Sequence, residues 1–219
     1  ALPLAQARPD IAGILAVEAS RPLAEMLERS RERAGAGRVA VVNVAAGAGD
    51  GEAWFDPVST SAFGQGFVSA EQGRGRCAVP LRSLDSLLAE RRVDRVSVLK
   101  IDVEGYEADV LRGAQKLLGG QEPPAILFEF YGVESGATKE RILPQQMLFD
   151  LGYRIFELEG NARVSELVAP LRVGFRTLLA LRRDDARLAM LVDRPGSGST
   201  NPAGERVAPA RAETQEGSP

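Results

Sequence analysis

Short apolar runs alternate along the chain with stretches whose apolar residues repeat at helical spacing. Nearly continuous apolar runs of this kind are typical of strands covered by helices on both faces of a parallel sheet. The runs are residues 14–17, 39–44, 96–101 and 125–130. The helices between and after them are expected at residues 22–34, 83–88, 106–118 and 138–151. Such alternation predicts an α/β fold with a doubly wound, mostly parallel, Rossmann-like sheet.

The C-terminal part of the chain departs from this alternation. Residues 153–158 and 175–181 suit two strands, which we expect to form an antiparallel pair at the edge of the sheet. From residue 195 onward the chain is rich in Pro, Gly and Ser and has Val207 as its one large aliphatic residue. Such a composition cannot offset the entropy lost on ordering. We therefore predict one domain over residues 1–194 and a disordered tail over residues 195–219.

The amino-acid composition excludes several kinds of catalytic site, metal site and binding partner. The 219 residues include no His and one Cys, Cys77. Without His, Ser-His-Asp catalysis and imidazole metal sites are excluded, so we expect no metal and assign proton transfer to carboxylates, Lys, Tyr or water. One Cys cannot form an intrachain disulfide and is compatible with the cytoplasm, where we expect the protein. The net charge of −3, without a dense basic cluster, argues against nucleic acid as a partner, and the lack of a long apolar run argues against a membrane.

Acidic side chains follow two of the predicted strands. The sequence Lys-Ile-Asp-Val-Glu-Gly over residues 100–105 places Asp102 and Glu104 where a strand gives way to a helix. Ligands of open α/β sheets bind beyond the carboxyl ends of the strands. Glu18 follows another strand, at the position where a carboxylate accepts hydrogen bonds from a ribose diol in Rossmann-like folds. The alternatives are a solvated turn residue for Glu18 and a helix-start residue favoured by the helix dipole for Glu104.

Five segments resemble, in sequence and in order, the FkbM family of methyltransferases that use S-adenosylmethionine (SAM). They are ILAVEAS, VVNVAAGAGDGEAWF, LRSLDSLL, VLKIDVEGYEADVLRGA and PPAILFEF, which together lie within residues 11–158. The resemblance implies a class I methyltransferase fold with SAM as the cofactor. It also implies methyl transfer to an oxygen of a small-molecule or sugar-like acceptor.

The resemblance assigns the cofactor side of the site to the first two strands. Glu18, with Ala19 beside it, would bind the ribose of SAM. The residues Asn43, Val44 and Ala45 would form the adenine side of the pocket. A sulfonium methyl group is already activated, so the protein would chiefly align the acceptor, exclude water and accept one proton.

The acceptor side would lie in the acidic segment that follows the third run. Asp102 could orient or deprotonate the acceptor hydroxyl, with Glu104 beside it. Lys100 shares strand parity with Asp102 and is either a catalytic residue or the ion-pair partner of a carboxylate.

Three further residues are candidates for binding the acceptor. Glu129 interrupts an apolar strand and faces either the site or solvent. Phe63 and Phe67 lie in residues 56–76, a glycine-rich stretch that we predict to be a long loop. Aromatic residues there could close over an acceptor or simply anchor the loop to the core.

One part of the family pattern is not found. Family members carry a D-x-G-x-x-x-G type turn after an earlier strand, and its glycines admit the methionine part of SAM. The helix that follows such a turn is expected here at residues 1–7, so we expect the first strand of the sheet to be missing from this sequence. Two sheet edges would then be unpaired, which favours self-association.

Two other functions remain open. A nicotinamide-binding oxidoreductase could use Glu18 in the same way, but that function does not explain why Asp102 and Glu104 occur together. A non-catalytic methyltransferase-like remnant or binding module would need neither cofactor.

Overall fold

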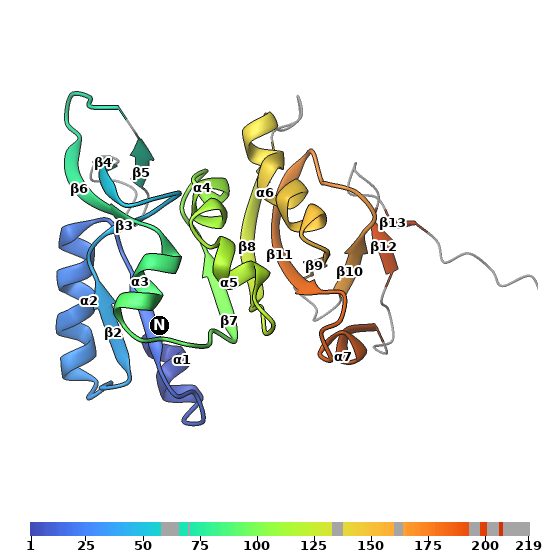
Figure 1. Cartoon of the computed structure of the whole chain (residues 1–219), viewed down its shortest axis with the longest axis horizontal. Helices are drawn as coiled ribbons and strands as arrows, with labels where there is room; N and C mark the ends of the chain where they lie inside the picture. The colour runs from blue at the N-terminus through green and yellow to red at the C-terminus, as the bar shows by residue number, and fades with distance from the viewer. Residues whose placement is uncertain are drawn as a thin grey trace, which may run out of the picture. The chain divides into compact units, whose positions relative to one another are not determined.

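The computed structural model describes residues 1–57, 66–69, 71–132, 138–159, 164–192, 198–200 and 206–207. These residues fall into two compact units (Figure 1). Unit 1 comprises residues 1–96 and 102–122, and unit 2 comprises residues 97–101 and 123–219.

Unit 1 contains a parallel pair of strands joined by a helix. Strands β1 (Ile14–Val17) and β2 (Val39–Val42) pair from Ile14 opposite Val39 to Val17 opposite Val42. Parallel strands need a crossover connection, which α2 (Arg21–Arg33) provides while lying beside β2 (Figure 1). Helix α1 (Leu2–Ala7) precedes β1 and confirms the helix predicted at residues 1–7.

A four-stranded sheet and three short helices complete unit 1. The strand order is β3-β6-β4-β5, with β3 parallel to β6 and the other pairs antiparallel. The strands are β3 (Ala45–Ala46), β4 (Gly51–Pro57), β5 (Gly66–Ser69) and β6 (Cys77–Arg82). The helices are α3 (Leu84–Glu90), α4 (Glu107–Arg112) and α5 (Gln115–Gly119). Ser83 caps α3, since its hydroxyl accepts the Ser86 N–H at 3.1 Å.

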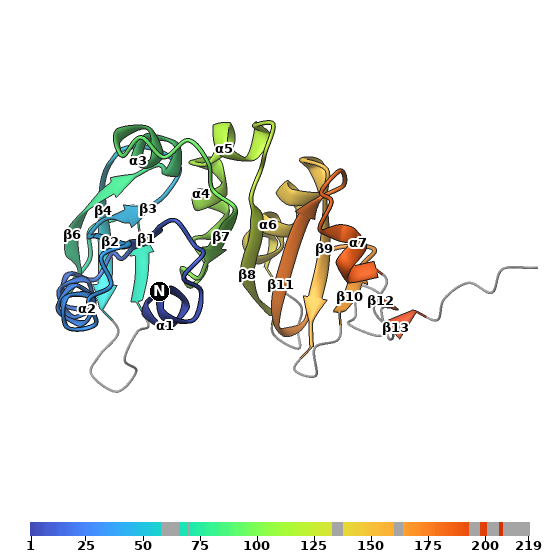
Figure 2. The same ribbon diagram turned by 90° about the horizontal axis from the view of Figure 1, so that it is seen from below.

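Unit 2 is built on a seven-stranded sheet in the order β13-β12-β10-β9-β11-β8-β7. Helix α6 packs on β8 and β9, where Leu148 is fully buried (Figure 2 gives a second view). The first strands are β7 (Val98–Ile101), β8 (Ala125–Gly132), β9 (Tyr153–Leu158) and β10 (Val164–Leu167). The remaining elements are β11 (Gly174–Arg182), β12 (Gly198–Thr200), β13 (Arg206–Val207), α6 (Lys139–Asp150) and α7 (Leu188–Val192).

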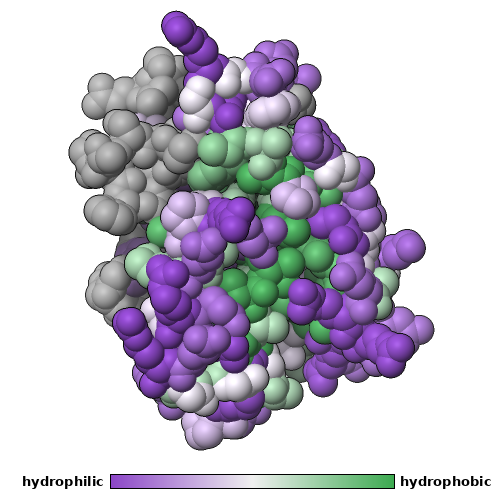
Figure 3. All heavy atoms as spheres, turned by 90° about the vertical axis from the view of Figure 1, so that its left-hand side faces the viewer, coloured by the Kyte–Doolittle hydropathy of each residue, from purple (hydrophilic) through white to green (hydrophobic). Residues whose placement is uncertain are grey.

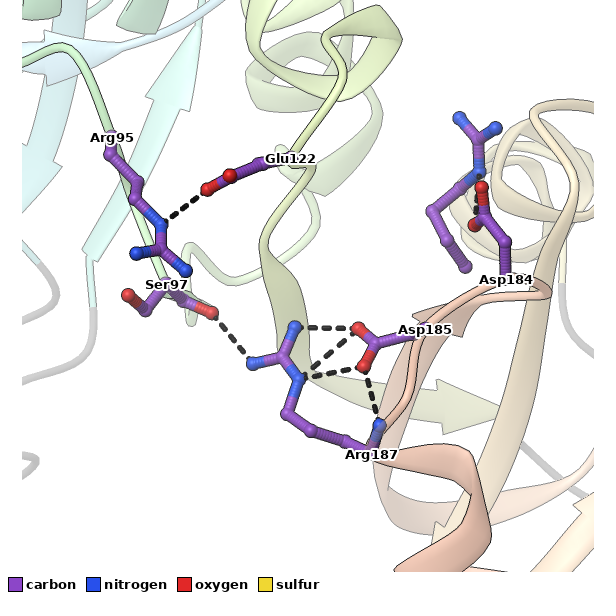
Figure 4. A network of polar contacts seen from close by, with 7 residues as sticks. Arg95, Ser97, Glu122, Asp184, Asp185 and Arg187 are labelled. Atoms are coloured by element: carbon purple, nitrogen blue, oxygen red, sulfur yellow. Dashed lines mark hydrogen bonds and ion pairs between the residues drawn. The ribbon is translucent and has the colours of Figure 1, made fainter.

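A polar cluster fixes the turn before α7 in unit 2. Arg187 donates through its Nη1 to the carbonyl of Ser97 at 3.1 Å, and its guanidinium pairs with Asp185 (Figure 4). The hydrogen bonds between the two side chains lower the pKa of Asp185 and raise the pKa of Arg187. The turn is thereby attached to the residue that precedes β7.

The doubly wound parallel sheet is not confirmed, because the sheets are mixed. Strand β11 pairs antiparallel with both β8 and β9, so it lies between them. The predicted antiparallel pair near the C-terminus is confirmed, but it continues through β10 instead of ending the sheet. Apolar runs indicate where strands are, whereas strand order depends on contacts between distant segments.

Several local predictions also differ from the structure. Part of the predicted loop at residues 56–76 is β5, in which Phe67 pairs opposite Asp56. Its Phe-Val pair suits a strand, a signal that the surrounding glycines obscure. The predicted helix over residues 106–118 is divided into α4 and α5 near Gly113. Within the predicted disordered tail, the described residues are those of two short strands, β12 and β13. The other residues of the tail lie outside the described part of the chain.

Within the described part of the chain, no helix is long and apolar enough to cross a membrane.

Candidate functional site

Glu18 lies directly after β1, as predicted. Its backbone N–H donates to the Val42 carbonyl at 2.9 Å, and its carboxylate Oε1 accepts the Ser20 N–H at 2.7 Å. Ser20 is the N-cap residue of α2, so the carboxylate is held between the end of β1 and the start of this helix. A carboxylate can accept about four hydrogen bonds, so one backbone bond leaves capacity for a ligand's hydroxyls.

Asn43 joins the ends of the two parallel strands. It follows β2, and its side-chain Nδ2 donates to the carbonyls of Glu18 at 2.8 Å and Ala19 at 3.1 Å. The structure therefore brings Glu18, Ala19 and Asn43 together. Val44 and Ala45 differ from them because both are buried, and Ala45 belongs to a core cluster against which Ala19 packs.

Asp102 and Glu104 lie on the turn that leads into α4. Asp102 is exposed and Glu104 is half-buried. Glu104 has a φ of 50° and the next residue, Gly105, has a φ of 100°. A positive φ is uncommon outside glycine and costs energy, and such residues cluster at active sites and ligand clamps.

A buried carboxylate that sequence reasoning missed supports this turn. Glu107 is only 7% exposed, and its Oε1 accepts the Gly105 N–H at 2.9 Å. A carboxylate in the first helical turn that reaches back to a preceding N–H resembles one half of a capping box. The spacing of Gly105 and Glu107 in the sequence is the signal that could have indicated this contact.

Residues 102–105, which carry Asp102 and Glu104, are called the acidic turn. The turn after β3 packs directly against α4, the helix that follows the acidic turn. A Cβ on Gly113 would lie 1.9 Å from the carbonyl oxygen of Gly47, and a Cβ on Gly47 would lie 3.1 Å from Cε1 of Tyr106. Both glycines are therefore required for this close approach. Burial, with a smaller effect from Asp109, raises the pKa of Tyr106. Gly47 thus lies against Tyr106 and Gly113, two residues of the segment that follows Asp102 and Glu104 in unit 1.

Asp50 anchors the same turn to the start of α3. Its Oδ1 accepts the Ser83 N–H at 2.8 Å, and its Oδ2 lies 3.3 Å from the Nε of Arg82. The backbone hydrogen bond is the largest of several effects that lower the pKa of Asp50. The turn between β3 and β4 is therefore attached to the end of α4 through Gly47 and to the start of α3 through Asp50.

Four further predicted site residues are Lys100, Glu129, Phe63 and Phe67. Lys100 and Glu129 belong to unit 2, where Lys100 pairs opposite Leu127, so Lys100 and Glu129 share one face of the sheet. Phe67 lies in β5, and Phe63 lies outside the described residues. Among the described residues, no group of three or more Cys, Asp or Glu side chains could hold a metal ion.

Comparisons with known proteins place the chain in a family. The model of the methyltransferase FkbM domain matches residues 7–155. A solved structure, a methyltransferase FkbM from Methylobacillus flagellatus KT, has a similar fold, with 15% identity and a TM-score of 0.52. That match covers 81% of this chain but 39% of the other, so this chain spans well under half of that protein. No curated protein matches. Because the family model covers more than half of its residues, the chain belongs to the FkbM methyltransferase family.

Proposed function

We propose that this chain binds SAM and takes part in methyl transfer to an oxygen of a small-molecule or sugar-like acceptor. The observation that carries the proposal is the Glu18 carboxylate, which is held at the carboxyl end of β1 by the Ser20 N–H. A carboxylate suits two vicinal hydroxyls because each of its oxygens can accept one hydrogen bond. Membership of the FkbM methyltransferase family supports the reaction class.

The residues after β1 and β2 fit the nucleoside part of SAM. Glu18 would hold the ribose, with Ala19 beside it, and the main chain at Asn43 would lie on the adenine side of the pocket. The side chains of Val44 and Ala45 are buried, so we assign these residues a role through their main chain. When bound, SAM supplies a methyl group that is already activated by the positive charge on its sulfur.

The acidic turn is our candidate for the acceptor side. We assign to Asp102, whose side chain is exposed, the task of orienting the acceptor hydroxyl and accepting its proton. Glu104 would contribute a second hydrogen-bond acceptor from its constrained backbone position. Lys100, as a catalytic or ion-pairing residue, and Glu129, Phe63 and Phe67, as acceptor contacts, remain predictions.

Thermal unfolding with added cofactors tests this function. A ligand that binds the folded chain raises its melting temperature, and the rise grows with the logarithm of the ligand concentration relative to Kd. We expect SAM to raise the melting temperature and NAD⁺ to leave it unchanged. A shift with NAD⁺ alone would favour the oxidoreductase, and a shift with neither would favour a non-catalytic relative.

A further inference from the structure

The side-chain amide of Asn43 is bonded to backbone, although Asn43 is exposed at the edge of the proposed ligand site. Both of its amide hydrogens are directed at the backbone of the neighbouring strand end, because Nδ2 donates to Glu18 and to Ala19. Since both partners are carbonyl oxygens, the NH₂ group must face them. An aspartate at this position would instead place a carboxylate against two carbonyls.

These bonds complete the immobilisation of Glu18. Its N–H donates to the Val42 carbonyl, its carbonyl accepts from Asn43, and its carboxylate accepts the Ser20 N–H. Backbone and side chain of Glu18 are therefore fixed by three separate contacts. Among them, the contact from Asn43 is the one made by another residue's side chain.

We propose that Asn43 is a positioning residue that acts through Glu18. It holds the peptide between Glu18 and Ala19 so that the carboxylate is presented to the vicinal hydroxyls of a nucleoside before the ligand arrives. This inference rests on the proposed binding of SAM at Glu18. It differs from a direct contact between Asn43 and the adenine, because the whole effect of the side chain would pass through Glu18.

A double-mutant cycle separates the two roles. The affinity for S-adenosylhomocysteine is measured by calorimetry for the 219-residue chain and for Asn43→Ala, Glu18→Ala and the double variant. We expect Asn43→Ala to weaken binding about tenfold in the wild-type background and less than about twofold when Glu18 is already Ala. An equal loss in both backgrounds would show direct contact and overturn the proposal.

Discrimination between two ligands excludes a merely structural role. The 2′-deoxy analogue of S-adenosylhomocysteine lacks half of the diol, so wild-type protein should bind it more weakly than the parent compound. Asn43→Ala should reduce this preference, whereas a general loss of structure would weaken both ligands equally and leave the preference unchanged. Asn43→Asp should behave like Asn43→Ala or worse, because it cannot donate to the two carbonyls.

Amide hydrogen exchange tests the contact without any ligand. If Asn43 holds Glu18 in place, the Ser20 N–H should exchange about tenfold faster in Asn43→Ala than in wild type. Ser30→Ala is the matched control, since it removes another side-chain bond to backbone, from Ser30 Oγ to the Met26 carbonyl on α2. Unchanged exchange at Ser20 would overturn the positioning role. Failure of wild-type protein to bind S-adenosylhomocysteine would instead contradict the proposed function alone.

Discussion

At the scale of single residues, two buried polar side chains, Glu107 and Tyr153, differ in whether their polar atoms have a hydrogen-bond partner. Glu107 is buried and accepts the Gly105 N–H, which supports the positive φ of Glu104. In unit 2, Tyr153 is fully buried, and its hydroxyl has no hydrogen-bond partner among the described residues. The first arrangement belongs to the candidate site, and the second is a cost to stability.

Removing the Glu107 carboxylate should destabilise the acidic turn. Glu107→Ala leaves the Gly105 N–H without its acceptor, so we expect the free energy of unfolding to fall by about 1–3 kcal/mol in urea titrations. Glu107→Gln keeps an acceptor oxygen and should cost less. Equal losses in the two variants would argue that packing, and not the hydrogen bond, is what Glu107 provides.

Tyr153 should make the protein sensitive to alkali. Burial raises the pKa of Tyr153 to about 12, from an ordinary value of 10.0. Because the folded state holds the proton more tightly, stability is fully present below pH 10 and falls as the pH rises toward 12. Tyr153→Phe should remove this loss, which we place at about 1–3 kcal/mol. Denaturant unfolding at a series of pH values measures the effect.

Tyr131→Phe is the control for this prediction. Tyr131 is 51% exposed, so its replacement should leave the pH profile unchanged. A profile of Tyr153→Phe that matches wild type would show that other groups cause the alkaline loss.

At the scale of elements, close contact between turns and helices decides the geometry of unit 1. Gly47 and Gly113 bring the turn after β3 against the end of α4. The side chain of Asp85 crosses from α3 to α5 and accepts the N–H groups of Lys116 at 2.8 Å and Leu117 at 3.0 Å. These contacts join α3, α4 and α5 to the turns beside the candidate site.

Gly113 and Gly119 offer a matched pair of substitutions. A Cβ on Gly113 would overlap the Gly47 carbonyl oxygen, so Gly113→Ala should lower the free energy of unfolding by about 3 kcal/mol or more. Gly119 lies in α5 with open space around it, and Gly119→Ala should be neutral or stabilising by up to about 1 kcal/mol. Chemical denaturation compares the two. Similar stabilities would show that the contact at Gly113 relaxes easily.

The elements also show how far sequence reasoning reaches. The apolar runs predicted β1, β2, β7 and β8, and Pro22 and Gly35 mark the start and end of α2. Gly113 is the C-cap residue of α4 and, as a glycine, a possible local signal for a helix end. Sequence could not reveal that this position requires a glycine, because the atom that a Cβ would meet is the distant carbonyl oxygen of Gly47. The position of β11 between β8 and β9 likewise depends on pairing over long separations.

In the candidate site, too, local sequence signals were predictable and contacts between distant segments were not. Strand ends and acidic side chains pointed to Glu18, Asp102 and Glu104, because the carboxyl end of a strand can be recognised from local pattern. The contacts that hold these residues were not predictable in the same way. The two bonds from Asn43 to the end of β1 depend on the pairing of β1 with β2.

At the scale of the whole molecule, apolar surface and unpaired strand edges are exposed. Figure 3 shows apolar residues gathered on one face of unit 1 within a polar surround, and Met26 on α2 is 48% exposed. Among the described strands, β1 pairs only with β2, and β7 pairs with β8 alone. Val98 on β7 is 60% exposed. Exposed apolar edges of this kind promote association between chains.

We therefore expect the chain to self-associate as its concentration rises. Val98→Lys puts a charge on the free edge of β7 and should shift sedimentation-velocity profiles toward monomer. Met190→Lys is the control, because Met190 is 68% exposed on α7 and lies on no strand edge. The same shift in both variants would attribute the effect to net charge, and no shift in Val98→Lys would remove the edge of β7 from the interface.

The central claim is that Glu18 binds the ribose of SAM. The most direct test is calorimetric titration of wild-type protein and Glu18→Ala with S-adenosylhomocysteine, with Ser30→Ala on α2 of unit 1 as a control. Loss of two hydrogen bonds to a charged group should weaken binding at least about tenfold in Glu18→Ala and leave Ser30→Ala unchanged. Equal affinity in Glu18→Ala and wild type would contradict the assignment of Glu18 to the ribose.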